Sequence, residues 1–572
     1  MSAGEAGGGT SARRAWHAVL LVVIVALVFA RVGRLEFLHW DDHANIAHNP
    51  HVNPPTLSGI AFFWRHAYAD LYVPLAYTVW SLLVLATGRG GTDSPWNVPA
   101  LPFHVANLVL HVAATLVVYR LLLKLLRAEW PAFAGALLFA IHPLQVEAVC
   151  WASGLRDVMG AMLALAAALA YVKSMEASSP RAWYEIATFA FVGALLSKPS
   201  AVVLPLIVAL FCAMLPNRSF ARSLRWLAPW CVVAVAWMVL TRAVQPAVDA
   251  FALPIWQRPL VAGDALAFYL SKLAWPVDLG IEYGRSPSYV LAHAWVYATA
   301  AVGIAFVVAI VLARRRAPWL ALAGSVFVLG LAPVLGLVSF AYQYYSTVAD
   351  RYAYLSMLGA AIAFAWCLRE LPPRVAGTIG VLALALLGAR SFDQTKYWVD
   401  DFAFLGRALE VNPRSVAAYS MLGASYMDRG RTDDAIGAYE HALAIEPADF
   451  RTQFDLGVAL DRAGRTNEAL EHLADSLAHG VESAEAHDYL GLVLAKSNRP
   501  AEALEHFRAA VRVDPLSWRA QFRLGVVLHQ TGRQREAETH LREALRLNPS
   551  YAPAADELDR VLRTRERAAS DK

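Results

Sequence analysis

Long apolar segments fill residues 16–389 and constrain the fold more than any other feature of the chain. A helix needs roughly 20 apolar residues to cross a bilayer. Because backbone polar groups in lipid must be satisfied internally, such segments are predicted to be α-helices. A mean hydropathy of +0.41 excludes a single soluble globular domain. Eleven spans are predicted at 16–33, 103–123, 130–149, 158–173, 183–197, 199–215, 226–243, 292–313, 317–338, 352–368 and 373–389.

The basic residues predict the orientation, because Lys and Arg concentrate on cytoplasmic loops. With eleven spans, 15 clustered basic residues share the N-terminal side. The N-terminus is therefore predicted to be cytoplasmic, and the C-terminus outside. Residues 71–87, interrupted by Pro74, are then a helix along the outer membrane face rather than a further span. The clustered basic residues are Arg13, Arg14, Arg120, Lys124, Arg127, Lys173, Arg181, Arg218, Arg222, Arg225, Arg314, Arg315, Arg316, Arg369 and Arg374.

The C-terminal part repeats every 34 residues and is polar, with 22 basic and 27 acidic residues in 401–572. Leu-Gly pairs begin at Leu422, Leu456, Leu490 and Leu524, and alanines recur at Ala435, Ala469, Ala503 and Ala537. Small residues at these positions let two helices approach closely, which is typical of tetratricopeptide repeats. About four full repeats with flanking helices are predicted over 397–566, followed by a tail at 567–572. Such an array offers a concave surface for an extended polypeptide; a spacer or an oligomerisation surface is the alternative.

Unusual polar residues gather in the loops predicted to face outward. Ionisable groups at the bilayer edge are costly and usually functional. A carboxylate can take a proton from a hydroxyl, and basic side chains can hold a phosphate leaving group. This chemistry suits a lipid-linked phosphosugar. Asp41 is the candidate general base, Asp42 would orient the acceptor or the base, and the donor phosphate is assigned to Arg156, Lys198 and Arg351. Supporting residues are Trp40, His142, Glu147, Asp157, Asp350 and Tyr352.

Each of these residues also has a structural explanation. The explanations are helix N-capping by Asp41 or Asp42, snorkelling of Lys198, and ion pairs Arg156–Asp157 and Asp350–Arg351. No cofactor is predicted. The four cysteines form no C-x-x-C pair, and no Cys/His spacing indicates a zinc site, so no metal ligand is assigned. An Asp pair could still recruit a divalent ion.

An ordered set of motifs, from about residue 16 to 565, resembles one family. It looks like the transmembrane and tetratricopeptide-repeat O-mannosyltransferases and their bacterial relatives, which are related to GT-C glycosyltransferases. Val73 stands where the family's second motif usually has Arg, a departure that bears on donor binding. The motifs are Trp40-Asp41-Asp42 with Asn45 and Asn49-Pro50, Tyr72-Val73-Pro74-Leu75, Phe103-His104-Val105-Ala106-Asn107, His142-Pro143-Leu144-Gln145-Val146-Glu147, Trp151 with Arg156-Asp157, Ser197-Lys198-Pro199 and Ala349-Asp350-Arg351-Tyr352.

The resemblance implies an all-α chain with a disordered cytoplasmic N-terminus (1–15), a polytopic GT-C-like membrane domain (16–390) and the repeat solenoid. It also implies an inverting transferase that moves a hexose, here mannose, from a polyprenyl phosphate to Ser/Thr of proteins on the extracytoplasmic side. The repeats would bind the polypeptide acceptor. The expected location is a membrane, the inner membrane in a bacterium, and no nucleic-acid partner is expected. Alternatives are a non-catalytic membrane-anchored repeat scaffold and a transporter of lipid-linked sugars or polymers.

Overall fold

The computed structural model describes residues 3–88, 98–176, 179–215, 220–245, 253–480 and 482–570. Within these ranges all the named secondary-structure elements are helices, which confirms the all-α prediction. The chain forms two compact units, Met1–Pro413 and Arg414–Lys572. Arg218, one of the basic residues used to predict orientation, lies outside the described residues.

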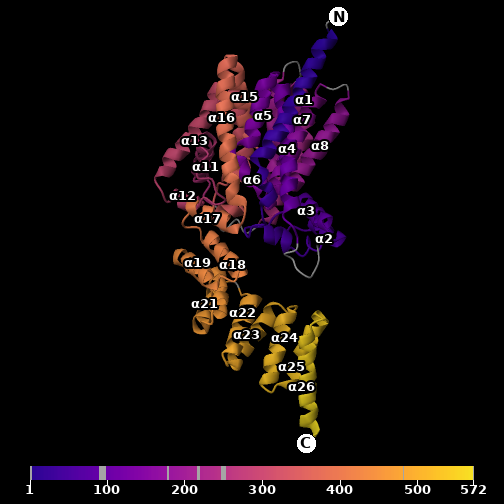
Figure 1. The fold of residues 1–572 in the computed structure, drawn as a ribbon, viewed down its shortest axis with the longest axis vertical. Helices are drawn as coiled ribbons and strands as arrows, with labels where there is room; N and C mark the ends of the chain where they lie inside the picture. Colours follow the sequence, from indigo (N-terminus) through magenta and orange to yellow (C-terminus); the bar gives the residue numbers. More distant parts are fainter. Residues whose placement is uncertain are drawn as a thin grey trace. The chain divides into compact units, whose positions relative to one another are not determined.

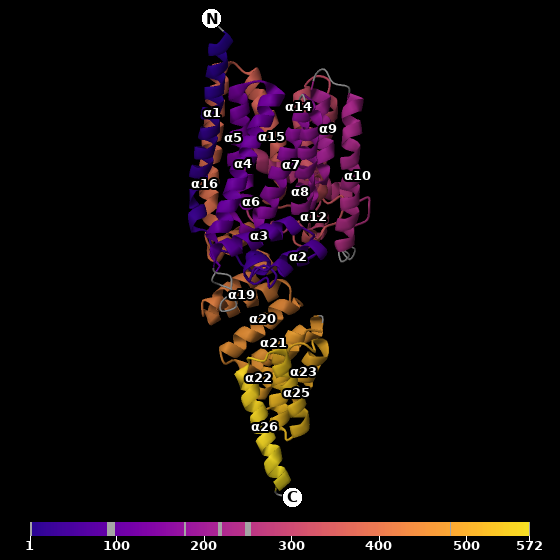
Figure 2. The same ribbon diagram turned by 90° about the vertical axis from the view of Figure 1, so that its right-hand side faces the viewer.

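The first unit is a bundle of mostly long, apolar helices (Figures 1 and 2). Its α-helices are α1 (Ala3–Val28), α2 (Leu57–Arg65), α3 (Pro74–Thr87), α4 (Leu101–Leu126), α5 (Glu129–Ile141), α6 (Val146–Cys150), α7 (Leu155–Ser174), α8 (Pro180–Ser197), α9 (Leu204–Met214), α10 (Phe220–Val244), α11 (Arg258–Ala274), α12 (Pro287–Leu291), α13 (Trp295–Ala313), α14 (Pro318–Leu331), α15 (Met357–Glu370), α16 (Pro373–Gln394) and α17 (Asp401–Val411).

The count of eleven spans is not confirmed. Among the described residues, six helices are long and apolar enough to cross a membrane: Ser11–Val28, Leu101–Leu126, Ala152–Ser174, Leu224–Val244, Trp295–Ala313 and Pro373–Trp398. A seventh is possible if α5 and the segment Pro143–Cys150, bent by 51° at their junction, count as one span. The other predicted spans fall on shorter or less apolar helices. Pro143 accounts for one interruption, because it falls inside the predicted span 130–149 and stands at a helix start.

Helix α3 corresponds to the segment predicted to lie along the membrane face. Its 14 residues would be about 21 Å long at 1.5 Å per residue, short of a hydrocarbon core of about 30 Å. Helices α2, α3, α12 and α17 all lie at the end of the first unit opposite the N-terminus (Figure 1). The segment that links α1 to α2 also lies at this end, which we call the polar end of the first unit (Figure 2).

Helix α11 was not predicted as a span, because Asp264 and Lys272 interrupt its apolar sequence. It packs closely against α13. A Cβ atom on Gly303 would lie 2.2 Å from the carbonyl oxygen of Gly263, so only glycine permits this approach. Small residues at helix contacts are the usual means by which membrane helices come together.

Two element boundaries differ from the sequence analysis. Helix α1 begins at Ala3, whereas residues 1–15 were expected to be disordered and the first span to start at 16. The side chains of Arg13 and Arg14 both approach Glu129 at the start of α5, at 3.7 and 2.8 Å. Helix α17, which was grouped with the repeats from residue 397, lies in the first unit.

The second unit is a solenoid of helix pairs followed by one further helix. The pairs are α18 (Val416–Asp428) with α19 (Thr432–Ile445), α20 (Phe450–Arg462) with α21 (Thr466–His479), α22 (Ala484–Lys496) with α23 (Pro500–Val513), and α24 (Trp518–Gln530) with α25 (Gln534–Leu547); α26 (Ala552–Ser570) ends the array. This confirms the predicted repeat solenoid.

The 34-residue register has a direct physical basis in this solenoid. A Cβ atom on Gly457 of α20 would lie 2.6 Å from the side chain of Leu473 in the facing helix, and Gly423, Gly491 and Gly525 meet equivalent side chains. The first helix of each pair is N-capped by Ser415, Asp449, Ser483 or Ser517, again 34 residues apart. The same cap and the same close contact therefore recur in each repeat.

Candidate active site

The two neighbouring carboxylates of the loop after α1 occupy different environments. Asp42 is fully buried, and its carboxylate accepts hydrogen bonds from the backbone N–H groups of Leu38 (3.1 Å) and Ser153 (2.8 Å) and from the Ser153 hydroxyl (2.6 Å). Burial raises the pKa of Asp42 to about 7, although the hydrogen bonds from Ser153 and Leu38 oppose this shift. Asp42 therefore ties the loop to the segment between α6 and α7.

Asp41 instead remains accessible. Its side chain is 36% exposed, and its Oδ2 lies 3.2 Å from Nη2 of Arg156 on α7. The short π-helix that follows, η2 (His43–Ala47), has Asp42 at its N-cap but no side-chain cap hydrogen bond. Helix capping thus does not account for either carboxylate, and of the two only Asp41 has an accessible side chain.

An ionic network continues from Arg156 toward Lys198. Nε of Arg156 lies 3.8 Å from Oδ2 of Asp157, and the other oxygen of Asp157 accepts a hydrogen bond from Nζ of Lys198. Burial, then the nearby charges of Arg351 and Arg156, lower the pKa of Lys198. The position of Lys198 requires Gly160, because a Cβ there would lie 2.9 Å from the Lys198 Cβ.

Arg351 lies deeper and is paired with Glu147 rather than with its sequence neighbour Asp350. Its Nη1 is 2.5 Å from Oε1 of Glu147, and its backbone N–H donates to Oε2 at 3.0 Å. The guanidinium also lies over the rings of Tyr342, Tyr352 and Trp151, at 4.4, 4.9 and 5.3 Å from their centroids. Aromatic faces stabilise a buried cation in this way.

Two of the three predicted phosphate-binding residues, Lys198 and Arg351, line a common hollow, whereas Arg156 does not. It is a small hollow, and it is partly open to solvent. Small residues of α7 leave the room for it. Its lining includes Asp157, Gly160, Ala161, Ala164, Lys198, Gly330, Arg351 and Tyr352.

The remaining predicted site residues have structural contacts. His142 is buried at the bend between α5 and α6, where its Nδ1 accepts a hydrogen bond from the Leu144 backbone at 3.2 Å. Asp350 is buried and accepts a hydrogen bond from the Tyr283 hydroxyl at 2.7 Å. Trp40 packs against Phe404 of α17, with ring centroids 6.1 Å apart.

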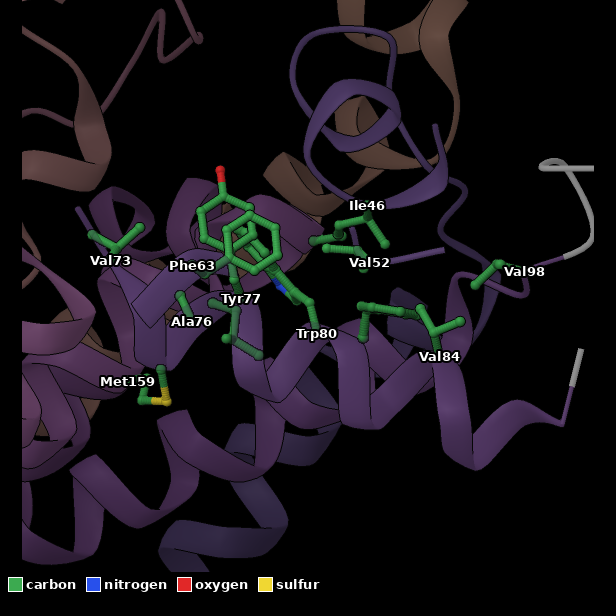
Figure 3. Packing of buried hydrophobic residues seen from close by; sticks show 13 residues of the cluster. Ile46, Val52, Phe63, Val73, Ala76, Tyr77, Trp80, Val84, Val98 and Met159 are labelled. Carbon is green, nitrogen blue, oxygen red and sulfur yellow. The ribbon is translucent and has the colours of Figure 1, made fainter. Parts of the chain in front are cut away.

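Val73 belongs to an apolar cluster beside the acidic loop. The cluster packs Val73 with Phe63, Tyr77 and Trp80, and Figure 3 shows these side chains together. The rings of Phe63 and Tyr77 stack at 4.0 Å, and the Tyr77 hydroxyl donates to Oδ1 of Asn45 at 2.9 Å. Val73 is buried, so an arginine at this position would have to displace this packing.

The sequence analysis did not identify several residues that lie in or beside the candidate site. Ser153 gave no signal as the partner of Asp42, because it lies 111 residues away in the sequence. Trp151 is buried between two guanidinium groups, and its indole N–H has no hydrogen-bond acceptor among the described residues. His39, His43 and Asp401 also lie together, close enough to share a metal ion. Four histidines between residues 39 and 51 were the available signal for this cluster.

Comparisons with known families match both parts of the chain. Residues 97–242 match the family model of dolichyl-phosphate-mannose-protein mannosyltransferases. This range contains Glu147, Arg156, Asp157 and Lys198. Residues 426–491 and 490–552 match tetratricopeptide-repeat models.

Curated relatives agree with these matches. The chain is 35% identical over 192 residues to protein O-mannosyl-transferase TMTC1 of Mus musculus, covering 30% of this chain and 19% of the relative. It is 35% identical over 130 residues to Tmtc2 of Drosophila melanogaster, covering 22% and 13%. A Caenorhabditis elegans protein O-mannosyl-transferase, F38B6.6, is 24% identical over 438 residues, covering 71% and 59%.

The resemblance inferred from the motifs is thereby confirmed: the chain combines a region similar to protein mannosyltransferases with tetratricopeptide repeats. The matched part nevertheless spans only about a fifth of the length of the mouse relative. Several long apolar helices, together with this similarity, indicate a multi-pass membrane protein.

Proposed function

We propose that this protein is a membrane O-mannosyltransferase. It moves mannose from a polyprenyl-phosphate carrier to Ser or Thr hydroxyls of proteins on the extracytoplasmic side, and its repeats bind the polypeptide acceptor. The observation that carries the proposal is the continuous network from the exposed Asp41 through Arg156 and Asp157 to Lys198. It connects an accessible carboxylate to the basic hollow within one cluster of side chains.

The two ends of this network have different roles in the proposed reaction: one activates the acceptor hydroxyl, and the other stabilises the leaving group. The acceptor oxygen attacks C1 of the sugar, and the bond between C1 and the phosphate oxygen breaks, so a single displacement inverts the anomeric centre. Asp41 takes the proton of the attacking hydroxyl. The departing polyprenyl phosphate gains negative charge, which Lys198 and Arg351 would stabilise from the hollow.

The existing ion pairs bear on how this stabilisation arises. Lys198 and Arg351 are each paired with a buried carboxylate, Asp157 and Glu147, so the cluster carries little net charge. The donor is a phosphate diester with one charge, and its leaving group has up to two. Because the leaving group carries more negative charge than the bound donor, the cations of Lys198 and Arg351 would stabilise it more strongly, and such a difference raises the rate. The indole N–H of Trp151, which has no acceptor within the part of the chain that the structure describes, offers a further donor beside these cations.

The acceptor surface is assigned to the solenoid. Partly exposed aromatic side chains recur along the first helices of its pairs, at Tyr426, Phe454, Tyr489 and Phe522. Aromatic residues supply large contact areas at low conformational cost, as an extended polypeptide ligand requires. The presence of a transferase-like region and of repeats in this one chain supports the same division of roles.

The test uses the full-length protein in detergent with two labelled donors, mannosyl polyprenyl phosphate and a nucleotide-linked mannose. Proteins of an envelope extract serve as acceptors. We expect label to enter protein only from the lipid-linked donor and to be released by β-elimination, which cleaves O-linked sugars. No incorporation from either donor, or incorporation from the nucleotide sugar alone, would overturn the proposal. A reporter joined after Lys572 and active only when exported tests the proposed orientation separately.

A further inference from the structure

Two segments far apart in sequence run alongside each other at the polar end of the first unit. Residues 31–43 follow α1, and residues 392–404 follow the apolar part of α16. The backbone N–H of Glu36 donates to the carbonyl oxygen of Val399 at 3.0 Å. This contact fixes the loop that carries Asp41 against the start of α17.

A histidine pair and a carboxylate meet where these segments touch. Nδ1 of His39 lies 2.6 Å from Oδ2 of Asp401, and the His39 backbone N–H donates to the other carboxylate oxygen at 2.8 Å. The ring of His43 stacks on that of His39, with centroids 4.2 Å apart, and the His48 ring lies 5.3 Å beyond. One ligand atom from each of His39, His43 and Asp401 lies within 4.8 Å of the others.

The donor set and its burial suit a transition-metal ion. Asp401 is only 8% exposed, so its charge lies largely out of water and needs a partner of opposite sign. Two imidazoles stacked at 4.2 Å would repel each other if both were protonated, and the neutral imidazole is the form that binds metals. Two imidazole nitrogens with one carboxylate oxygen are a common ligand set for Zn²⁺.

We propose that His39, His43 and Asp401 bind one divalent transition-metal ion of the Zn²⁺ type. Zn–N and Zn–O distances of about 2.0–2.2 Å place ligand atoms roughly 3.3 Å apart in a tetrahedral site, so shifts of about 1 Å suffice. The His39–Asp401 hydrogen bond is then replaced by two metal–ligand bonds. His48 or a water molecule takes the fourth position.

The consequence concerns the acidic loop. Asp41 lies between the two histidine ligands in sequence, so a bound ion would clamp the short segment that carries it to α17. The ion has a positioning role in this arrangement and takes no part in the transfer itself. The inference stands on the side-chain cluster and does not depend on the proposed mannosyl transfer.

The test is metal binding by the full-length protein in detergent, purified with a histidine-free tag and stripped with chelator. Titration with Co²⁺, whose visible spectrum reports coordination geometry, should saturate at one ion per chain, and Zn²⁺ should displace it. His39→Gln, His43→Gln and Asp401→Asn should each weaken binding by more than the roughly 10–100-fold that loss of an outer-shell partner costs. His66→Gln, an exposed histidine at the end of α2, is the matched control and should bind as the wild type does.

A second readout separates a metal site from a metal-free clamp. Zn²⁺ should raise the melting temperature of the wild type and of His66→Gln but not that of His43→Gln. A cooperative melting transition in the presence of chelator shows that each variant is folded without metal. If the wild type binds no more Co²⁺ than the His39→Gln/His43→Gln double variant, the cluster is only a hydrogen-bonded clamp and the proposal fails. Equal losses in His66→Gln would also overturn it.

Discussion

Replacing Asp42 by Ala should destabilise the first unit strongly, whereas the neighbouring change Asp41→Asn should not. The Asp42 carboxylate is fully buried and accepts hydrogen bonds from two backbone N–H groups and the Ser153 hydroxyl. The substitution removes all of these acceptors at once. Asp41 is partly exposed, and Asn preserves its size.

The magnitude follows from the donors left without a partner. A buried donor without an acceptor costs about 1–3 kcal/mol. The Ser153 hydroxyl can rotate toward another acceptor, but the N–H groups of Leu38 and Ser153 cannot, so Asp42→Ala should cost about 2–6 kcal/mol. Asp42→Asn keeps one oxygen for Ser153 and should cost less. Ser153→Ala removes one hydrogen bond and should cost about 1 kcal/mol.

The assay is thermal melting of the full-length variants in one detergent, with expression level as a second readout. We expect Asp42→Ala to melt lowest, then Asp42→Asn, then Ser153→Ala, with Asp41→Asn close to the wild type. If Asp42→Ala had the same melting temperature as Asp41→Asn, the buried hydrogen bonds of Asp42 would contribute nothing to the stability of the first unit. The distinction between the two carboxylates would then be refuted.

Three further predictions concern packing, protonation and the buried ion pair. Gly457→Leu should lower the melting temperature of the repeat unit, because overpacking costs about 1–3 kcal/mol, whereas Gly437→Ala, in open space on α19, should leave it equal or higher. Burial and nearby acidic groups raise the pKa of Asp455 from 3.8 to about 7, so the folded unit holds this proton more tightly than the unfolded chain and loses stability as pH rises between these values. Asp455→Asn should remove that loss in denaturant unfolding at about pH 8 and change little at about pH 4; an unchanged pH dependence would contradict this. Arg351→Met should cost about 3–5 kcal/mol by leaving Glu147 unpaired, and adding Glu147→Leu should restore the melting temperature but not the affinity for donor. Recovery of normal donor affinity in the double variant would show that Arg351 is only structural.

The repeat unit could be predicted from sequence because its interactions are short-range. Gly457 meets Leu473 within one helix pair, and every repeat presents the same contact 34 residues later. The membrane unit was harder to predict, because hydropathy averages over windows. The charged residues Asp264 and Lys272 lower the local hydropathy of α11, so it was not predicted as a span. Pro143 bends a segment that hydropathy alone predicts to be one continuous span.

The candidate site was predicted as a set of residues, but their roles depended on long-range contacts. Asp41 and Asp42 are adjacent and chemically identical, and the partners that distinguish them, Arg156 for Asp41 and Ser153 for Asp42, lie more than 100 residues away. The partner of Arg351 is Glu147, 204 residues away, rather than Asp350 beside it. Pairings of this kind are set by how the helices pack and leave no periodic signal in the sequence.

The most direct test of the central claim is the initial rate of mannose transfer by Asp41→Asn at saturating mannosyl polyprenyl phosphate. Asn keeps the shape of the side chain but cannot take up the proton of the acceptor hydroxyl. A positioned base contributes about 10²–10⁴-fold, so we expect a loss of that order with an unchanged melting temperature. Asp70→Asn, an exposed carboxylate in the loop between α2 and α3, is the matched control and should retain the wild-type rate. A rate for Asp41→Asn within a few-fold of the wild type would contradict the assignment of Asp41 as the base.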